Sequence, residues 1–420
     1  MDLRTWQSLA EPAHEELIRL ASQANPRDVA AVDRLRKLTP DRDLVHAALQ
    51  LAEARRKAVP KFGRRAATLW ADPQGVEMAS SAMAAAHKAR RFHYLPAHTP
   101  IIDLCCGIGG DAMQLGETAL PVTAVDLDPV RAWMAGRNAR CSSLVGGATQ
   151  VDVEQAAIHI DPPRRTSASG GVSRLWRLSD LHPGADEMRA LFARARRGGA
   201  IKLGPGVDHA EIRAHFPHSE LEIISENGTL TQAVIWIGES MRTHPGRACA
   251  TLLQGHSDDS PASWLARTMQ IRGTPDERPP PIAVDHRPLR YVFEPDDSIE
   301  RARLQHVLCE TVHAPLLHPA LGLLTADALV AHPMLTPFEV LEVLPWNTKR
   351  VKAALAERRA GIIEVKTRGG AVHPDQVQAE LRGTGDEMLT VFVLRFDREL
   401  RAIIARRVPR PPAHRAAAAS

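Results

Sequence analysis

The chain has 420 residues, 44% of them hydrophobic and 24% charged, which is typical of a globular protein with more than one domain. No apolar run is long enough to span a membrane, and the N-terminus lacks a signal-peptide pattern. The five cysteines, with Cys105 and Cys106 adjacent, suit neither a disulfide framework nor a zinc site. We therefore expect a cytoplasmic protein without a membrane or metal partner, of unknown oligomeric state.

The net charge is +4, and basic residues gather in short runs at 54–65, 88–92 and 193–197. Such runs favour a polyanionic partner, and RNA is the partner that we expect. Each run taken alone is more typical of a solvated helix face.

Residues 1–95 predict a helical N-terminal domain, because apolar residues recur there at three- and four-residue spacing. From residue 96 to about 275, short apolar runs that end in turns alternate with helical segments, which predicts a doubly wound α/β sheet of parallel strands. Residues 220–238 break this alternation, since two apolar stretches flank Asn227-Gly228, a strong hairpin signal. A terminal antiparallel hairpin on a parallel sheet is the strand plan of class I methyltransferases.

The remaining sequence predicts a proline-rich linker at 276–288 and a small α+β domain at 289–400. We expect the last stretch, 401–420, to be a flexible tail, because it is rich in arginine, proline and alanine.

A glycine-rich turn follows the first expected strand in the segment DLCCGIGGD, residues 103–111. Gly107 and Gly109 would let a ligand approach the backbone, as in dinucleotide sites. A pyrophosphate would be repelled by Asp103 and Asp111, whereas the ammonium and sulfonium groups of S-adenosylmethionine would be attracted. The turn therefore favours S-adenosylmethionine as cofactor, with an NAD(P)-dependent oxidoreductase as the alternative.

Two further acids are candidates for the cofactor site. Asp126 ends the second strand, where a carboxylate can bind both ribose hydroxyls. Asp152 would contact the adenine amine if it ends the third strand, although the residues before it form only a weak strand pattern. Asp128 precedes Pro129 and is expected to be a helix N-cap.

Asp161, Pro162 and Pro163 follow the fourth strand and predict an acceptor site. The two prolines make a rigid corner, so the Asp161 carboxylate and the Pro162 carbonyl can accept both hydrogens of an exocyclic amine. This would orient the nitrogen toward a methyl donor without a metal. The expected catalytic residues are therefore Asp161, Pro162 and Pro163.

The segments DLCCGIGGD, AVDLDP and DPPRR in this order resemble nucleic-acid methyltransferases that modify base amino groups. With KLGPGVD, VLEVLPWNTKRVKAAL and IIEVKTRG, the chain is similar to bacterial class I methyltransferases that have a THUMP-like C-terminal domain and are related to RNA cap guanine-N2 methyltransferases. The resemblance implies that Gly107, Gly109 and Asp126 bind the cofactor. It also implies that Asp161, Pro162 and Pro163 hold the amine and that the C-terminal domain binds RNA.

Where related enzymes commonly have an aromatic residue after the two prolines, this chain has Arg164 and Arg165, which can stack on a base or bind phosphate. Trp176 could supply a ring, and Lys202, after the fifth strand, could contact substrate phosphate. In the C-terminal domain a basic face around Trp346 is expected from Lys349, Arg350, Lys352, Lys366 and Arg368.

Two alternatives stay open at this stage. DPPR also resembles RNA uracil-C5 methyltransferases, but their chemistry needs a cysteine nucleophile, and Cys249 and Cys309 lie in unlike contexts. A non-catalytic protein that binds S-adenosylmethionine or RNA would have the same cofactor motif.

Overall fold

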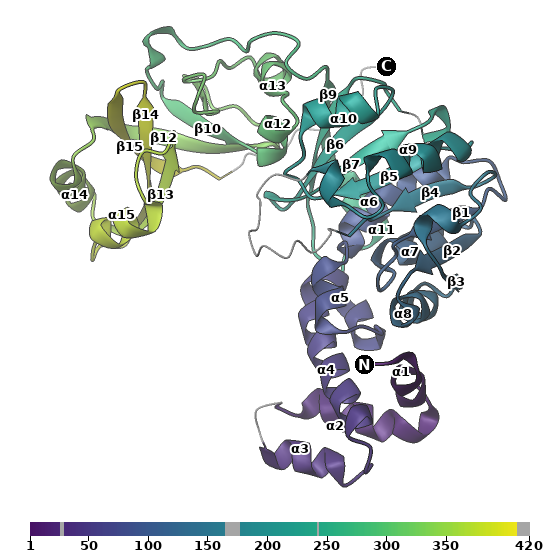
Figure 1. The fold of residues 1–420 in the computed structure, drawn as a ribbon. Coiled ribbons are helices and arrows are strands. Elements are labelled where there is room, and N and C mark those ends of the chain that lie inside the picture. Colours follow the sequence, from purple (N-terminus) through teal and green to yellow (C-terminus); the bar gives the residue numbers. More distant parts are fainter. Residues whose placement is uncertain (26–28, 164–176, 242, 410–420) are drawn as a thin grey trace. The chain divides into compact units, whose positions relative to one another are not determined.

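The structure is a computed structural model that describes residues 1–25, 29–163, 177–241 and 243–409 (Figure 1). The chain forms two compact units. Unit 1 comprises residues 1–247 and 253–268, and unit 2 comprises residues 248–252 and 269–420. Each unit has its own sheet and core.

Unit 1 contains a mainly parallel sheet whose strands follow the order β3-β2-β1-β4-β5-β7-β6. β1 pairs in parallel with β2 and β4, β2 with β3, and β4 with β5, whereas β7 is antiparallel to both β5 and β6. The strands are β1 (Ile101–Leu104), β2 (Val122–Asp126), β3 (Ser142–Val145), β4 (Ala157–Ile160), β5 (Gly199–Leu203), β6 (Glu220–Glu226) and β7 (Thr229–Ile237). This is the doubly wound sheet with a terminal hairpin that the sequence predicts, so the fold class is confirmed.

The hairpin turn has the backbone that its sequence requires. Asn227 and Gly228 both adopt positive φ, +51° and +86°. Two successive positive φ values match the right-handed twist of the flanking strands, and Asn-Gly is the pair that adopts them most readily. The turn therefore reverses the chain between β6 and β7.

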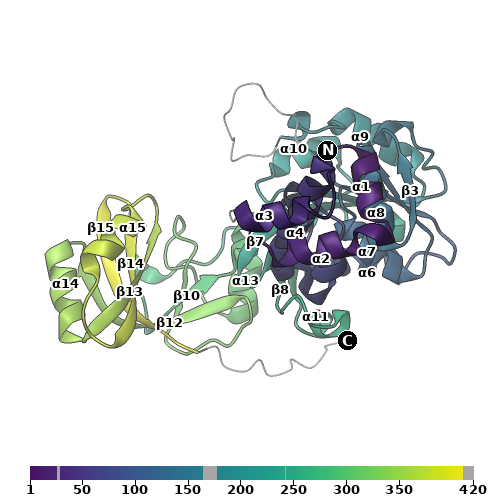
Figure 2. The same cartoon turned by 90° about the horizontal axis from the view of Figure 1, so that it is seen from below.

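The N-terminal helices share a hydrophobic core with this sheet. The buried side chains of Trp6, Leu51 and Phe92 belong to one cluster with Ile101 and Trp236 of the sheet. The long helix α4 leads from the outer helices to α5 and α6, which lie next to the sheet (Figures 1 and 2). The helices of unit 1 are α1 (Leu3–Leu9), α2 (Glu15–Gln23), α3 (Val29–Arg36), α4 (Arg42–Phe62), α5 (Pro73–Met78), α6 (Ala82–His93), α7 (Gly110–Leu115), α8 (Pro129–Ala139), α9 (Ala185–Arg194), α10 (His209–His215) and α11 (Pro261–Ala266).

Unit 2 contains the antiparallel pair β8 (Ala248–Leu253) and β9 (Met269–Gly273) and a second sheet of order β11-β10-β12-β15-β14-β13. In the second sheet β13 and β14 are parallel and the other pairs antiparallel. Its strands are β10 (Tyr291–Pro295), β11 (Leu324–Ala326), β12 (Leu335–Pro345), β13 (Ala360–Arg368), β14 (Glu387–Phe396) and β15 (Glu399–Arg407). The helices of unit 2 are α12 (Asp297–Arg301), α13 (Gln305–Val312), α14 (Thr348–Glu357) and α15 (Pro374–Leu381). This α+β arrangement is the one predicted for the C-terminal domain.

The start of the expected tail is wrong. Residues 401–407 complete β15, and Ala402–Ala405 are buried between β12 and β14. Because arginines flank this short apolar stretch on both sides, its sequence does not show the alternating pattern by which a strand is recognised.

Among the described helices, none is long and apolar enough to cross a membrane.

Candidate cofactor and active site

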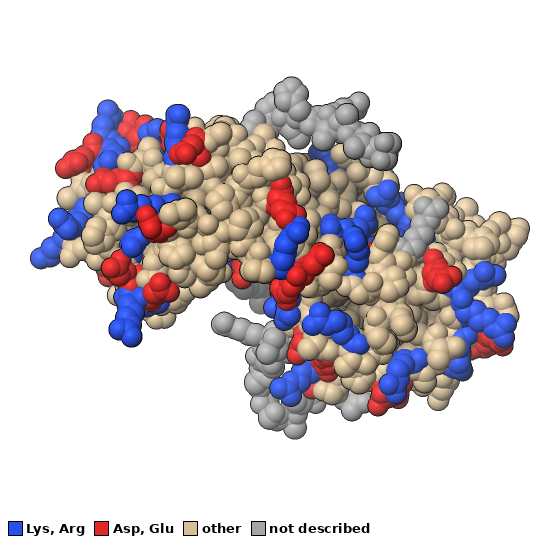
Figure 3. Space-filling view, turned by 90° about the horizontal axis from the view of Figure 1, so that it is seen from above, with Lys and Arg blue, Asp and Glu red and all other residues tan. Residues whose placement is uncertain are grey.

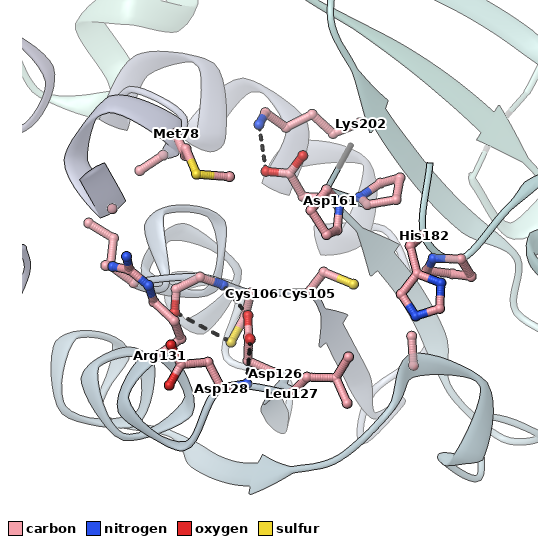
Figure 4. A pocket seen from close by; sticks show the side chains of 18 of the residues that line it. Met78, Cys105, Cys106, Asp126, Leu127, Asp128, Arg131, Asp161, His182 and Lys202 are labelled. Carbon is pink, nitrogen blue, oxygen red and sulfur yellow. Dashed lines mark hydrogen bonds and ion pairs between the residues drawn. The ribbon is translucent and has the colours of Figure 1, made fainter. Parts of the chain in front are cut away.

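A cavity of about 890 Å³ opens at the carboxyl ends of β1, β2, β4 and β5. Ligands bind at this edge in open α/β sheets, because the loops that leave the strands converge there. The cavity is lined by the glycine-rich turn, the end of β2, residues 146–150, the corner after β4 and the end of β5. Part of α5 completes the wall, and Figure 4 shows the side chains in place.

Gly107 and Gly109 of the glycine-rich turn have different structural roles. Gly107 has φ +55°, and a Cβ there would meet no atom within 4 Å, so its backbone faces open space in the cavity wall. Gly109 has φ +83° and is the N-cap of α7. A Cβ on Gly109 would lie 2.9 Å from the Cα of Ala135, so this glycine lets the turn pack on α8 and does not line the cavity.

Asp126 lies at the cavity, at the end of β2. Its carboxylate accepts hydrogen bonds from the backbone N–H of Gly107, at 2.9 Å, and of Asp128, at 3.0 Å. Burial raises the pKa of Asp126 although these two bonds oppose the rise. Asp128 caps α8 by accepting from the Val130 N–H at 2.8 Å, as expected, and also lines the cavity.

Asp103, Asp111 and Asp152 do not line the cavity. Asp103 is buried within β1 and bonds the Nδ1 of His159 at 2.7 Å. Asp111 pairs with the buried Lys88 at 2.6 Å. Asp152 accepts a hydrogen bond from the Glu154 N–H at 3.1 Å. It does not end β3, because the turn at 148–150 lies between that strand and Asp152, and residues 146–150 line the cavity in its place.

The corner after β4 brings Asp161, Pro162 and Pro163 to the cavity, as expected from the strand plan. Lys202, near the end of β5, approaches Asp161, with 2.5 Å between Nζ and Oδ2. Burial opposes the charge on Lys202, but the Asp161 carboxylate outweighs it and raises the pKa of Lys202. Lys202 is therefore charged and forms an ion pair with Asp161 within the site.

Sequence reasoning missed His182, which is exposed at the cavity. Its backbone N–H donates to the Pro163 carbonyl at 3.0 Å, which places it next to the corner after β4 (Figure 4). Nothing in the segment LSDLHPG around it signals this position. The predicted residues Arg164 and Arg165, and the ring of Trp176, lie outside the described residues.

The charge of the cavity fits S-adenosylmethionine. Among the described lining residues, the carboxylates of Asp126, Asp128 and Asp161 face two cations, Arg131 and Lys202. This balance suits a ligand with a net positive charge. The volume is within the range of small-molecule sites.

Comparisons with known proteins agree with this fit. A model of THUMP domain-like sequences matches residues 335–407, which run from β12 to β15. Two uncharacterized S-adenosylmethionine-dependent methyltransferases of Mycobacterium tuberculosis, from strains CDC 1551 and H37Rv, are each 29% identical over 330 residues, 77% of this chain and 84% of the relative. A crystal structure of a candidate methyltransferase from Porphyromonas gingivalis W83 has a TM-score of 0.70 at 16% identity and covers 97% of this chain and 100% of that one.

The structural match shows the methyltransferase fold, and both sequence relatives are named as methyltransferases, which favours this reading over an NAD(P)-dependent oxidoreductase. The fold and the relatives together support S-adenosylmethionine-dependent methyl transfer as the activity of this chain.

Proposed function

We propose that this methyltransferase modifies an exocyclic amine of an RNA base, as the cap guanine-N2 methyltransferases that its motifs resemble do. The observation that carries the proposal is the Asp161–Lys202 pair at the cavity. Lys202 engages Oδ2 of Asp161, and within the described part of the chain no donor reaches Oδ1. One carboxylate oxygen therefore stays available to an amine.

The residues of the corner would position the amine. Asp161 Oδ1 and the Pro162 carbonyl accept its two N–H groups, which directs the nitrogen lone pair into the cavity. The bound donor supplies an electrophilic methyl group. Lys202 holds the Asp161 carboxylate in place, and Asp161 can take up the proton that the methylated nitrogen loses.

Methylation of a ring carbon would need a cysteine thiolate, and the two cysteines at the cavity are poor candidates. Burial and the nearby Asp126 raise the pKa of Cys105, and burial with the nearby Asp103 raises that of Cys106. Both thiols are therefore protonated at neutral pH, which favours a nitrogen acceptor.

Replacement of Cys105 by alanine is accordingly expected to change kcat by less than about 3-fold, because a protonated thiol makes no bond to substrate. Single-turnover kinetics measure this. A loss of about 100-fold with unchanged S-adenosylhomocysteine affinity would instead indicate a nucleophile and refute the amine assignment.

The THUMP-like unit supports RNA as the molecule that carries the amine. Lys349, Arg350 and Lys352 of α14 are exposed, and no acid among the described residues pairs with them. Lys366 and Arg368 are instead paired with Glu294. The expected basic face is therefore reduced to α14.

The basic runs of unit 1 offer less support. In the run at 54–65, Lys57 pairs with Glu77, Arg65 pairs with Glu117, and Lys61 is bound to backbone carbonyls at the end of α5. The face in Figure 3 likewise has Lys and Arg lying among Asp and Glu. We therefore assign RNA binding to α14 rather than to these runs.

Neutralising α14 with Lys349→Gln, Arg350→Gln and Lys352→Gln is expected to raise KM for RNA about 10-fold or more, with kcat unchanged. The slope of log KM against log salt should fall by about 2, because fewer phosphates are neutralised. Arg359→Gln is the matched control, since Arg359 lies beyond the end of the same helix and is paired with Asp386 at 2.8 Å. An unchanged KM and salt slope would contradict RNA binding by α14.

The substrate class is tested with labelled S-adenosylmethionine and separate pools of RNA, DNA and protein, followed by nucleoside analysis. We expect label in an N-methylated RNA nucleoside, and an initial rate of labelling at least about 100-fold lower with Asp161→Ala. Label confined to DNA or protein, or on a base carbon, would refute the proposal.

A further inference from the structure

Met78, the last residue of α5, is an exposed apolar residue in the wall of the cavity. It is 57% exposed, whereas Val76 of the same helix is buried. Figure 4 shows its thioether pointing into the cavity, toward the side where Lys202 and Asp161 lie. A large apolar group that faces a cavity is stabilised when another apolar surface covers it. Met78 therefore points to a ligand with an apolar face.

The main chain on both sides of Met78 is held in place by Lys61 of α4. The Lys61 Nζ donates to three backbone carbonyls, those of Val76 at 2.8 Å, Glu77 at 2.7 Å and Ala79 at 2.8 Å. These carbonyls lie at the C-terminal end of α5, where a cation is favourable. The Met78 backbone is therefore fixed, while its unbranched side chain keeps the freedom to adapt to a ligand.

This end of α5 lies on the side of the cavity that contains Lys202. Burial and the nearby Lys202 lower the pKa of Lys61, so the two ammonium groups are close enough to repel each other. Ser81 Oγ donates to the Glu226 carboxylate in the β6–β7 hairpin, and β7 pairs with β5, the strand of Lys202. Lys202 is the ion-pair partner of the proposed acceptor residue. Met78 therefore belongs to the acceptor side of the cavity.

Few side chains of the cavity can pack against a base. Phe, Tyr and Trp are absent from the described lining residues, and the sequence at 164–175, after the two prolines, contains none of them. Two large apolar residues of the described lining are strongly exposed, Met78 and Leu127. Leu127 follows Asp126 and so belongs to the donor side of the proposed site. Of these two residues, Met78 is the one available to an acceptor.

We propose that Met78 packs against the ring of the acceptor base and thereby helps to select an aromatic amine as substrate. This inference rests on the proposed function, because it requires the methylated amine to belong to a base. A thioether makes favourable contacts with an aromatic ring, and a methionine side chain adapts to rings of different shape. Asp161 and Pro162 hold the amine while Met78 holds the ring, so the N-terminal helical segment takes part in acceptor binding.

Met78→Gln tests this inference, because glutamine keeps the length of the side chain and makes its end polar. The assay uses labelled S-adenosylmethionine and limiting RNA from cells that lack this protein, so that the initial rate reports kcat/KM. We expect labelling to be about 5- to 30-fold slower. Met78→Leu keeps an apolar surface and should stay within about 3-fold of the unmodified protein. Calorimetry should show S-adenosylhomocysteine affinity within about 3-fold for both variants, since Met78 is assigned to the acceptor.

Met388→Gln is the matched control, because Met388 is 61% exposed on β14 and does not line the cavity. An unchanged rate with Met78→Gln would refute the inference and leave the proposed function intact. Equal losses with glutamine and leucine, or a parallel loss of S-adenosylhomocysteine affinity, would also refute packing of Met78 on the base. Failure of the unmodified protein to label RNA would refute the proposed function itself.

Discussion

Replacement of Asp161 by alanine is expected to lower kcat by about 10²- to 10⁴-fold and to leave S-adenosylhomocysteine affinity within about 3-fold. The reason is that Asp161 would position the acceptor in the proposed mechanism, whereas Asp126 and the glycine-rich turn, elsewhere in the cavity wall, would bind the donor. Single-turnover kinetics and calorimetry on the same preparation measure the two quantities.

The Asp161 variant leaves Lys202 without its carboxylate partner, so a control for local damage is needed. Asp161→Asn keeps the shape of the side chain and one acceptor oxygen, and we expect it to retain more activity than alanine. Loss of cofactor affinity in step with kcat would contradict the assignment of Asp161 to the acceptor.

The largest effect on stability is expected from Asp111, which neutralises a buried lysine. Lys88 is 1% exposed, and its Nζ lies 2.6 Å from Asp111 and bonds Ser80 and Gln232. Removal of one partner of such a pair costs about 3–5 kcal/mol, because the other charge stays buried. Asp111→Ala should lower the free energy of unfolding by this amount at pH 7, measured by urea denaturation.

A second substitution tests the cause. Because the buried charge itself is the penalty, Asp111→Leu combined with Lys88→Met should recover most of the loss. The exposed pair of Glu154 and Arg196 is the control, and Glu154→Ala should change stability by less than about 1 kcal/mol. A double variant as unstable as Asp111→Ala would contradict the ion-pair account.

The Asp111–Lys88 pair also predicts how the free energy of unfolding changes with pH. Burial alone would raise the pKa of Asp111, but Lys88 and His159 outweigh it and lower this pKa below 3.8. The folded protein therefore releases the Asp111 proton more readily than the unfolded chain does. The ionised Asp111 carboxylate stabilises the fold above pH 3.8, and this stabilisation is lost as the pH falls below that value.

The sequence predicted the parts of the site that lie at strand ends. Alternating strands and helices placed Asp126 and Asp161 on one edge of a parallel sheet, and the Asn227-Gly228 turn predicted the hairpin. These features are local, since a strand end and a turn can be recognised from the residues around them.

The misplaced residues depend on contacts between distant segments. Asp103 has the spacing of a strand-end acid, yet it faces His159 of β4 inside the unit. A histidine within the apolar run AAIHI is a signal that a buried partner exists, but the pattern does not say which one. The side chain of Arg131 on α8 reaches Gly75 on α5, and helical periodicity does not specify a contact of this kind.

A crystal structure with S-adenosylhomocysteine tests the account most directly. We expect the ribose hydroxyls on the Asp126 carboxylate and the sulfur directed toward Asp161 and Pro162. A ligand bound elsewhere, or one with its amino-acid group at Asp161, would contradict the proposed direction of methyl transfer.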